Sequence, residues 1–522
     1  MEASPQQPGA ASGQGPAQTA VGDRVQLHAK DLLDHRRPSR CDLRIYLREQ
    51  HTPVAPPSPF DEMIRRLGQR HEVAELTKLQ PVVNLGVGSL EQRAQWTRDE
   101  VGKGAPVIYQ GVLMLETELG GMPATVVAEP DFLVASGTGY AMRESRLAGR
   151  ATQQEHLEVV LALQAAGWLF RETLEQEPAA LEVATGSGAI IAVVDDGGAQ
   201  ALGQLAHLAQ LKRLVADLAP PPFEPVNWLK CQACAFVRYC WVRAVERYDV
   251  ACIPAIAEPL ARALHEQGVT GAARLVEAFD DESLAAFVRP AAGGDAPVGE
   301  EAAVGILRSA RAFASGREEV FATPDVLLSD NYAVFDSEGL PPQFDELDKV
   351  YVWGMQVYGT LPSPYTAAMA TGDPDGDRIG WVGFLTEAAA LFEYYGDIPF
   401  VHWLDDERRA IDRYVARYGD PDGVAARVLA NMIDLEVVMR ESIAVPLPSN
   451  SLKAISKYAG SKRDLDQYGR DWSLAKYIEV VETGDEFQRS GLVGQVQSNN
   501  REDLEATNAV LRWLLSRAAE RR

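Results

Sequence analysis

Basic residues are scarce in this 522-residue chain, which has 50 Lys and Arg against 74 Asp and Glu and a net charge of −24. Proteins that coat nucleic acid non-specifically are usually basic, so this balance argues against that class, although not against an enzyme with one local basic face. Cysteine is also scarce, at five residues, which excludes a small disulfide scaffold. The apolar fraction of 46% and the charged fraction of 24% are typical of a folded globular protein.

Several other features are missing from the sequence. No apolar run approaches the ~18 residues that cross a bilayer, so we expect no membrane partner. Residues 1–24 are rich in Pro, Gly, Ala and Gln and lack the basic start and apolar core of a signal peptide. We therefore expect a disordered tail over 1–24 and a cytoplasmic protein with reduced cysteines. No Walker A pattern occurs, so any helicase partner would be a separate chain.

Hydrophobic periodicity predicts an α/β protein with two main units. In the first unit we expect helices over 61–79, 155–173 and 202–218, and strands over 106–114, 125–134, 140–147 and 190–195. The segment 135–139 is expected to join two of these strands as a hairpin turn. Composition then divides the chain into a tail (1–24), a first α/β domain (25–250), a small helical insert (251–289), a linker (290–305) and a second α/β domain (306–522).

Four of the cysteines are candidates for one metal site. Cys231, Cys234 and Cys240 form a C-x2-C-x5-C pattern, and Cys41 lies far upstream. Thiolate ligands favour an iron–sulfur cluster or zinc, and a zinc site more often shows two C-x2-C pairs. The alternative is four ordinary buried cysteines. The fifth, Cys252, is assigned to packing.

A first pair of acidic residues falls on the predicted hairpin. Asp131 lies on one strand and Glu144 on its partner, followed by Arg146. Two carboxylates on adjacent strands suit Mg²⁺ or Mn²⁺, which prefer oxygen ligands and can activate water for phosphodiester hydrolysis. Carboxylates near hairpins are also common as solvated groups.

These motifs together resemble RecB-like PD-(D/E)xK nucleases with a four-cysteine iron–sulfur clasp. Pro130-Asp131 and Glu144-x-Arg146 match the nuclease motif, Gly68-x-x-His71-Glu72 resembles the family's G-x-x-H-E helix, and Gln164-x3-Trp168 resembles its Q-x3-Y helix. The resemblance covers about residues 27–248. It implies a restriction-endonuclease-like (RecB-type) domain, a [4Fe–4S] cluster on Cys41, Cys231, Cys234 and Cys240, metal ligands His71, Asp131 and Glu144, and catalytic roles for Arg146 and Gln164.

Two positions depart from that family. Arg146 stands in place of the family lysine, and Trp168 in place of a tyrosine. Arginine keeps the positive charge but cannot lose a proton, and its planar fork is not equivalent to an ammonium group. We therefore expect weak or absent nuclease activity from this site alone.

A second acidic group is spread over the second unit. Asp336 and Glu338 end a strand and fall on the same face of it, because side chains alternate along a strand. Glu407 follows the segment 400–406, and Asp503 is expected at the start of a helix over 504–513. Four carboxylates that converge could hold the two metal ions of a phosphodiester hydrolase. Asp434 is interpreted as a helix N-cap rather than a ligand.

This second pattern resembles the RNase H-like, DEDD-type exonuclease domain that follows RecB-like nucleases in some bacterial proteins. The resemblance covers about residues 331–517 and includes Ser451-Leu-Lys453 and the stretch Asn500 to Thr507. It implies that Asp336, Glu338, Glu407 and Asp503 are catalytic metal ligands. Glu407 replaces the usual aspartate, and Asn499 stands where a tyrosine or histidine usually orients water.

Two basic segments are candidates for contact with nucleic acid. One carries Lys230 and Arg238 among aromatic residues, and the other carries Lys453, Lys457, Lys462 and Arg463. Basic and aromatic side chains together suit phosphate contact and base stacking, although both segments could be solubilising surfaces with core aromatics.

The hypothesis is therefore a cytoplasmic, two-module nuclease of DNA processing or repair. It would act on DNA that is single-stranded or has free ends, with RNA as the other possible substrate, and would use Mg²⁺ or Mn²⁺ beside a [4Fe–4S] cluster or zinc. The alternative is a catalytically degenerate scaffold that binds nucleic acid or a separate helicase without cutting.

Overall fold

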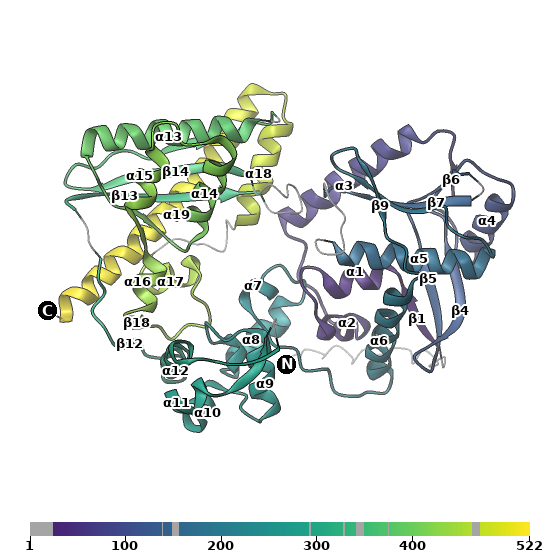
Figure 1. The fold of residues 1–522 in the computed structure, drawn as a ribbon, viewed down its shortest axis with the longest axis horizontal. Coiled ribbons are helices and arrows are strands. Elements are labelled where there is room, and N and C mark those ends of the chain that lie inside the picture. The colour runs from purple at the N-terminus through teal and green to yellow at the C-terminus, as the bar shows by residue number, and fades with distance from the viewer. Residues whose placement is uncertain are drawn as a thin grey trace, which may run out of the picture.

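The computed structural model describes residues 24–137, 139–148, 156–291, 294–326, 329–340, 349–373, 375–461 and 470–521. The predicted tail lies outside these residues except for Arg24. The protein is mixed α/β, and Figure 1 shows an N-terminal α/β unit in purple and blue, a helical unit in teal and a C-terminal α/β unit in green and yellow. Within the described residues, none of the helices combines the length and the apolar character that a membrane span requires.

The N-terminal unit contains two sheets. The six-stranded sheet has the order β2-β3-β6-β7-β8-β9, and the three-stranded sheet has the order β1-β5-β4. The strands are β1 (Val25–His28), β2 (Val83–Asn84), β3 (Val107–Tyr109), β4 (Leu113–Leu119), β5 (Met122–Ala128), β6 (Phe132–Ser136), β7 (Gly139–Arg146), β8 (Ala180–Thr185) and β9 (Ile190–Val193). The helices are α1 (Lys30–Arg36), α2 (Asp42–Glu49), α3 (Pro59–Lys78), α4 (Leu90–Gly102), α5 (Leu157–Leu174) and α6 (Ala199–Ala216).

The predicted hairpin is confirmed. Strands β6 and β7 pair antiparallel from Phe132↔Arg143 to Ser136↔Gly139, and Gly137 adopts a positive φ of 61° in the turn. The buried helix α5 then crosses over to β8, which runs parallel to β7. Since Phe132 pairs with Arg143, the register brings Asp131, just before β6, beside Glu144 on β7.

The helical unit follows the N-terminal unit. It contains α7 (Trp228–Cys231), α8 (Val237–Glu246), the 3-10 turn η1 (Val250–Cys252), α9 (Glu258–Glu266), α10 (Ala272–Ala278), α11 (Asp281–Ala285) and α12 (Glu300–Ser315). Cys252 is buried in its core, as the packing assignment predicts.

The linker prediction for residues 290–305 is wrong. Strands β10 (Val288–Ala291) and β11 (Gly294–Pro297) form an antiparallel hairpin, and α12 begins at Glu300. Pro290 and Pro297 lie within these two strands, and Ala303 and Ile306 bury one face of α12 in the helical core. Composition alone does not distinguish such a hairpin from a flexible linker.

The C-terminal unit is built on a five-stranded sheet with the order β15-β14-β13-β16-β17. The strands β13 (Asn331–Gly339), β14 (Val350–Gly359) and β15 (Thr366–Met369) pair antiparallel, whereas β16 (Phe400–His402) and β17 (Met432–Asp434) extend the sheet in parallel with β13. A small sheet pairs β12 (Glu319–Val320) with β18 (Ile443–Ala444). The helices are α13 (Gly376–Tyr395), α14 (Asp406–Tyr418), α15 (Val424–Ala430), α16 (Leu435–Arg440), α17 (Leu452–Tyr458), α18 (Arg470–Glu482) and α19 (Glu486–Arg521).

Helix α19 differs from its sequence prediction. It has 36 residues, so Asp503 lies in its middle rather than at its start. Leu492 and Val496 are buried on its first turns, and this packing keeps the chain helical through Gly491 and Gly494.

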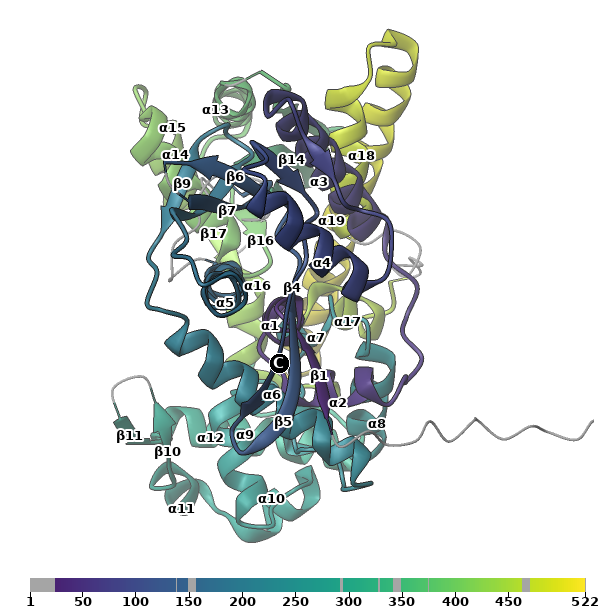
Figure 2. The ribbon, with the colours of Figure 1, turned by 90° about the vertical axis from the view of Figure 1, so that its right-hand side faces the viewer.

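Helix α3 joins the two α/β units. Phe60, Met63 and Leu67 on α3 pack in one apolar cluster with Tyr351 and Tyr477 of the C-terminal unit. Arg66 and Arg70 form ion pairs with Glu482 at the end of α18. Figure 1 and Figure 2 both show α3 beside α18, so one helix belongs to the N-terminal unit and contacts the C-terminal unit.

Candidate metal centres and nucleic-acid contacts

The C-terminal unit brings three of its predicted acidic ligands together. One carboxylate oxygen from each of Asp336, Glu338 and Asp503 lies within 4.8 Å of the other two. Asp336 and Glu338 come from one face of the central strand β13, and Asp503 comes from α19. Three converging carboxylates are hard oxygen donors, which fits Mg²⁺ or Mn²⁺.

Asp336 is held by a hydrogen bond from α19. Asn500 Nδ2 donates to Asp336 Oδ2 at 2.6 Å, and the Tyr365 hydroxyl donates to Asn500 Oδ1 at 3.0 Å. Gly354 pairs with Asp336 across β13 and β14, and a Cβ at this position would overlap Asn500 Oδ1. The glycine therefore permits the close approach of Asn500 to the strand. Burial is the main cause of the raised pKa of Tyr365, and the nearby Asp336 and Glu338 carboxylates raise it further.

The other two carboxylates also have polar neighbours. The Tyr351 hydroxyl lies 3.4 Å from Glu338 Oε2 and 3.2 Å from Ser473 Oγ. Asn499 Nδ2 lies 3.5 Å from Asp503 Oδ2, at the limit of a hydrogen bond. Asn499 thus contacts a predicted metal ligand, as its place one turn before Asp503 on α19 requires.

Among the residues described, Glu407 does not belong to this three-carboxylate group, and its role as a fourth metal ligand stays a prediction. It lies in the first turn of α14, with its Oε2 3.6 Å from His402 Nδ1 and without a hydrogen bond. Burial raises the pKa of Glu407, and the neighbouring His402 only partly offsets that effect. Sequence spacing alone could not fix the direction of this side chain. Asp434 caps α16 by accepting from the Glu436 backbone N–H, which confirms its N-cap assignment.

The acidic pair of the N-terminal unit is bridged by Arg146. Arg146 Nη2 lies 2.7 Å from Glu144 Oε2, and Nη1 lies 3.8 Å from Asp131 Oδ2. Asp131 Oδ2 also accepts the Ser145 backbone N–H at 2.8 Å. Burial first, and then repulsion from Asp131, raise the pKa of Glu144 to about 8, while Arg146 opposes the shift. A guanidinium group thus pairs with both of the carboxyl groups that the sequence assigns to a metal ion.

Glu72 and Tyr109 are part of this site and were not predicted. The Tyr109 hydroxyl donates to Glu72 Oε1 at 2.7 Å. Repulsion from Glu72 contributes to the raised pKa of both Asp131 and Glu144. The signal in the sequence was the position of Glu72, next to His71 in the G-x-x-H-E segment.

His71 and Gln164 are held by backbone carbonyls. His71 Nε2 lies 3.0 Å from the Ala184 carbonyl oxygen on β8, and Gln164 Nε2 donates to the Val194 carbonyl oxygen at 2.9 Å. Within the described ranges, His71, Asp131 and Glu144 do not form a group with all ligand atoms within 4.8 Å of one another. Gln164 Oε1 is buried without a hydrogen bond, so this amide is oriented by its NH2 group alone.

The four predicted cluster cysteines line one cavity. Cys41 immediately precedes α2, whereas Cys231, Cys234 and Cys240 come from α7, the following turn and α8, and all four border about 340 Å³ of empty space. Burial raises the pKa of the Cys41 and Cys240 thiols to about 12, so thiolates here require a compensating cation. The donor set of four thiols fits a soft metal centre.

A second group with metal-ligand geometry lies beside this cavity. Asp42 Oδ1 lies 2.7 Å from His35 Nε2 and 3.1 Å from His207 Nε2. Burial alone would raise the pKa of Asp42, but hydrogen bonds from the two histidines outweigh it and lower the pKa. The group connects α1, α2 and α6, and no motif spacing in the sequence indicates it.

The basic segments are only partly available to a ligand. The structure does not support the predicted contact of Lys230 with nucleic acid. Its Nζ pairs with Glu224 at 2.6 Å and with Glu258 at 3.0 Å, and only 9% of its side chain is exposed. Arg238 on α8 and Lys453 and Lys457 on α17 are exposed. Lys462 and Arg463 lie outside the described residues.

Comparisons with known proteins add little to this description. No protein-family model matches the chain, and no curated protein matches it. One similar solved structure is described as "Crystal structure of SSO0001"; it has 16% identity and a TM-score of 0.23 and covers 42% of this chain and 88% of that one. A likeness at this TM-score supports no conclusion about fold or function.

Proposed function

We propose that the protein is a metal-dependent nuclease whose hydrolytic site is the group Asp336, Glu338 and Asp503. The observation that carries the proposal is the convergence of these three carboxylates from two separate elements within 4.8 Å. Two divalent ions held by such a group can activate water and stabilise the charge on the attacked phosphate. The order β15-β14-β13-β16-β17, with three antiparallel strands followed by two parallel ones, supports an RNase H-like assignment, since that arrangement is expected of this fold.

The chain's own residues would position the ions and the substrate. Asn500 holds Asp336 in place, and Tyr351 borders Glu338, so two of the ligands are restrained before a metal binds. The exposed Lys453 and Lys457 of α17 lie in the same unit and would contact phosphates by charge.

The N-terminal unit would be a RecB-like module without its own hydrolytic activity. Arg146 bridges Asp131 and Glu144, so a divalent ion entering between them would face a fixed positive charge. This contact favours a binding role for the module. It is also the observation that favours the second candidate function, a scaffold that binds nucleic acid without cutting it.

The four cysteines would hold a [4Fe–4S] cluster that closes the N-terminal unit. In the part of the chain that the structure describes, no three cysteine sulfurs lie within 4.8 Å of one another. Tetrahedral zinc with four Zn–S bonds would hold them about 3.8 Å apart, whereas a cubane cluster spaces its thiolates more widely. When bound, the cluster would supply a structural cross-link between Cys41 and the C-x2-C-x5-C segment.

The test is hydrolysis of end-labelled single-stranded DNA, duplex DNA and RNA by the full chain with Mn²⁺ or Mg²⁺. The proposal expects cleavage of at least one substrate, its loss with chelator, and its loss in Asp503→Asn. Absence of cleavage with every substrate and both metals, together with unimpaired nucleic-acid binding, would instead establish the scaffold function.

A further inference from the structure

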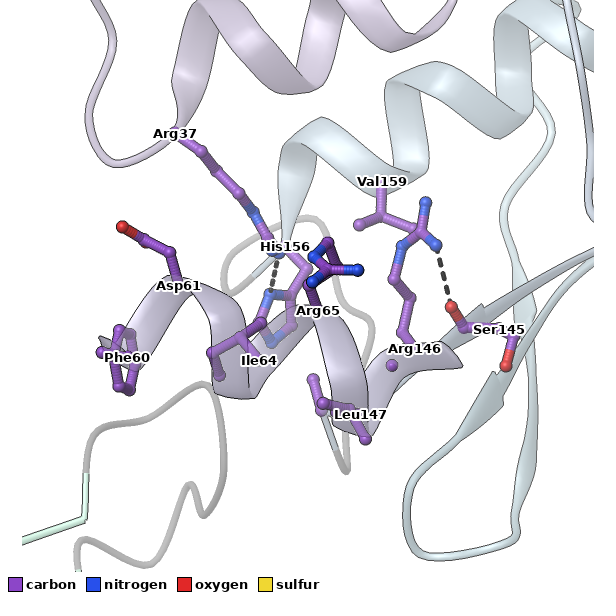
Figure 3. A pocket seen from close by; sticks show the side chains of 12 residues that line it. Arg37, Phe60, Asp61, Ile64, Arg65, Ser145, Arg146, Leu147, His156 and Val159 are labelled. Carbon is purple, nitrogen blue, oxygen red and sulfur yellow. Dashed lines mark hydrogen bonds between the residues drawn. The ribbon is translucent and has the colours of Figure 1, made fainter. Parts of the chain in front are cut away.

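A basic pocket borders the first acidic site on the side of α3. It is formed by α3, the end of β7 and the start of α5, and encloses about 980 Å³ including its open mouth. Figure 3 shows Arg37, Arg65, Arg146 and His156 around this space, with Arg37 and His156 joined by a hydrogen bond of 3.4 Å. Arg146 therefore lies between the pocket and the Asp131–Glu144 pair.

Among the described residues, most of the charge in this pocket is paired: Asp61 also lines it, and Arg146 pairs with Glu144. Arg37 pairs with Glu158. Arg65 is exposed and makes no ion pair with any residue that the structure describes. Arg40, close to Arg37 in sequence, is likewise exposed. The exposed Arg65 is therefore open to an anionic ligand, in a chain whose net charge is −24. Arginine forks suit phosphate because they can donate two parallel hydrogen bonds.

The pocket also has apolar lining residues. Phe60 and Ile64 on α3, Leu147 after β7 and Val159 on α5 lie among its charged side chains. A base or a sugar can pack against such a surface while the attached phosphate meets the arginines. The combination fits a nucleotide better than a free inorganic anion.

We propose that this pocket binds a phosphate-bearing nucleotide of a nucleic-acid strand, so that the N-terminal module holds the strand while the C-terminal module cuts it. This inference rests on the proposed function for the identity of the strand as substrate. The phosphate could be a terminal monoester or an internal diester, and both present the same chemistry to Arg65, Arg37 and Arg146.

The test is binding of labelled single-stranded oligonucleotides to the full chain in a chelator, measured by fluorescence anisotropy. Each oligonucleotide carries a 5′-phosphate, a 3′-phosphate or only hydroxyl ends. We expect Arg65→Glu to weaken binding at least about 10-fold, as loss of a charge-assisted contact and its replacement by repulsion would do. Arg98→Glu, an equal charge change at an exposed position on α4, is the matched control and should bind like the parent.

Each outcome decides the proposal. If Arg65→Glu removes a preference for one phosphorylated end, the pocket binds a terminal phosphate. If Arg65→Glu weakens the binding of all three oligonucleotides equally, the pocket binds an internal phosphate. Equal effects of Arg65→Glu and Arg98→Glu, or no effect of Arg65→Glu, would overturn the proposal. Arg65→Gln repeats the test without adding a negative charge. Because no cleavage occurs in chelator, failure of this binding is distinguishable from failure of hydrolysis at Asp336.

Discussion

Asn500 on α19 donates a 2.6 Å hydrogen bond to Asp336 on β13, and this contact fixes the helix against the central strand at the acidic site. The same helix carries Asp503, one turn further on. The contact therefore sets the position of one metal ligand relative to another across two elements that are far apart in sequence. Its partner Tyr365 completes a partly buried chain of hydrogen bonds.

Removal of the Asn500 side chain should weaken metal binding. In Asn500→Ala, Asp336 loses the hydrogen bond from Asn500 and the ligand oxygens lose their fixed spacing, so we expect a 10- to 100-fold weaker affinity for Mn²⁺, roughly the effect of losing such a partner. Calorimetric titration of Mn²⁺ measures the affinity directly. Asn508→Ala, which removes a buried asparagine two turns later that accepts from Tyr332, should leave it unchanged. Equal losses in the two variants would contradict the positioning role of Asn500.

Gly354→Ala should produce the same defect by steric means. The added methyl group would overlap Asn500 Oδ1, so the amide must move away from Asp336. We expect weaker Mn²⁺ binding together with a lower melting temperature, because a buried contact is overpacked. Gly305→Ala on α12, where nothing lies within 4 Å of a new Cβ, is the control. Normal metal binding in Gly354→Ala would show that the close approach is not needed.

The cysteine cavity should bind iron and not zinc. We expect the purified full chain to be brown, with absorbance near about 400 nm, and Cys41→Ser to lose both colour and iron. Cys252→Ser removes a buried thiol of the helical unit that does not line the cavity, and it should keep its iron. Stoichiometric zinc without iron in the parent would refute the cluster.

Glu158 should make the free energy of unfolding depend on pH in the acid range. Burial alone would raise its pKa, but the hydrogen bond with His156 and the charge of Arg37 lower it from 4.5 to about 2. The carboxylate thus stabilises the folded state above pH 4.5, and this contribution is lost as the pH falls toward about 2. In urea unfolding, the parent should exceed Glu158→Gln in stability near neutral pH, by a margin that shrinks below pH 4.5. A margin independent of pH, like that of the exposed control Glu266→Gln, would contradict this assignment.

Local patterns predicted the elements that carry the chemistry, but not all of its geometry. The hairpin of β6 and β7 follows from two apolar strands around a glycine turn, and the face shared by Asp336 and Glu338 follows from strand alternation. The direction of Glu407 depends on its burial beside His402, which no spacing encodes. Lys230 forms ion pairs with Glu224 and with Glu258, which is 28 residues further along the chain, and the local segment that suggested a surface role does not encode this contact.

The most direct test compares one carboxylate from each acidic site in the same Mn²⁺-dependent cleavage assay. Asp336→Asn and Glu144→Gln each replace a carboxyl group by an amide with little change in shape, and melting curves establish that both variants fold. The account predicts that Asp336→Asn abolishes cleavage, whereas Glu144→Gln cleaves at the parent rate because Arg146 already pairs with that carboxyl group. Loss of cleavage in Glu144→Gln with retention in Asp336→Asn would contradict it and place hydrolysis in the N-terminal module.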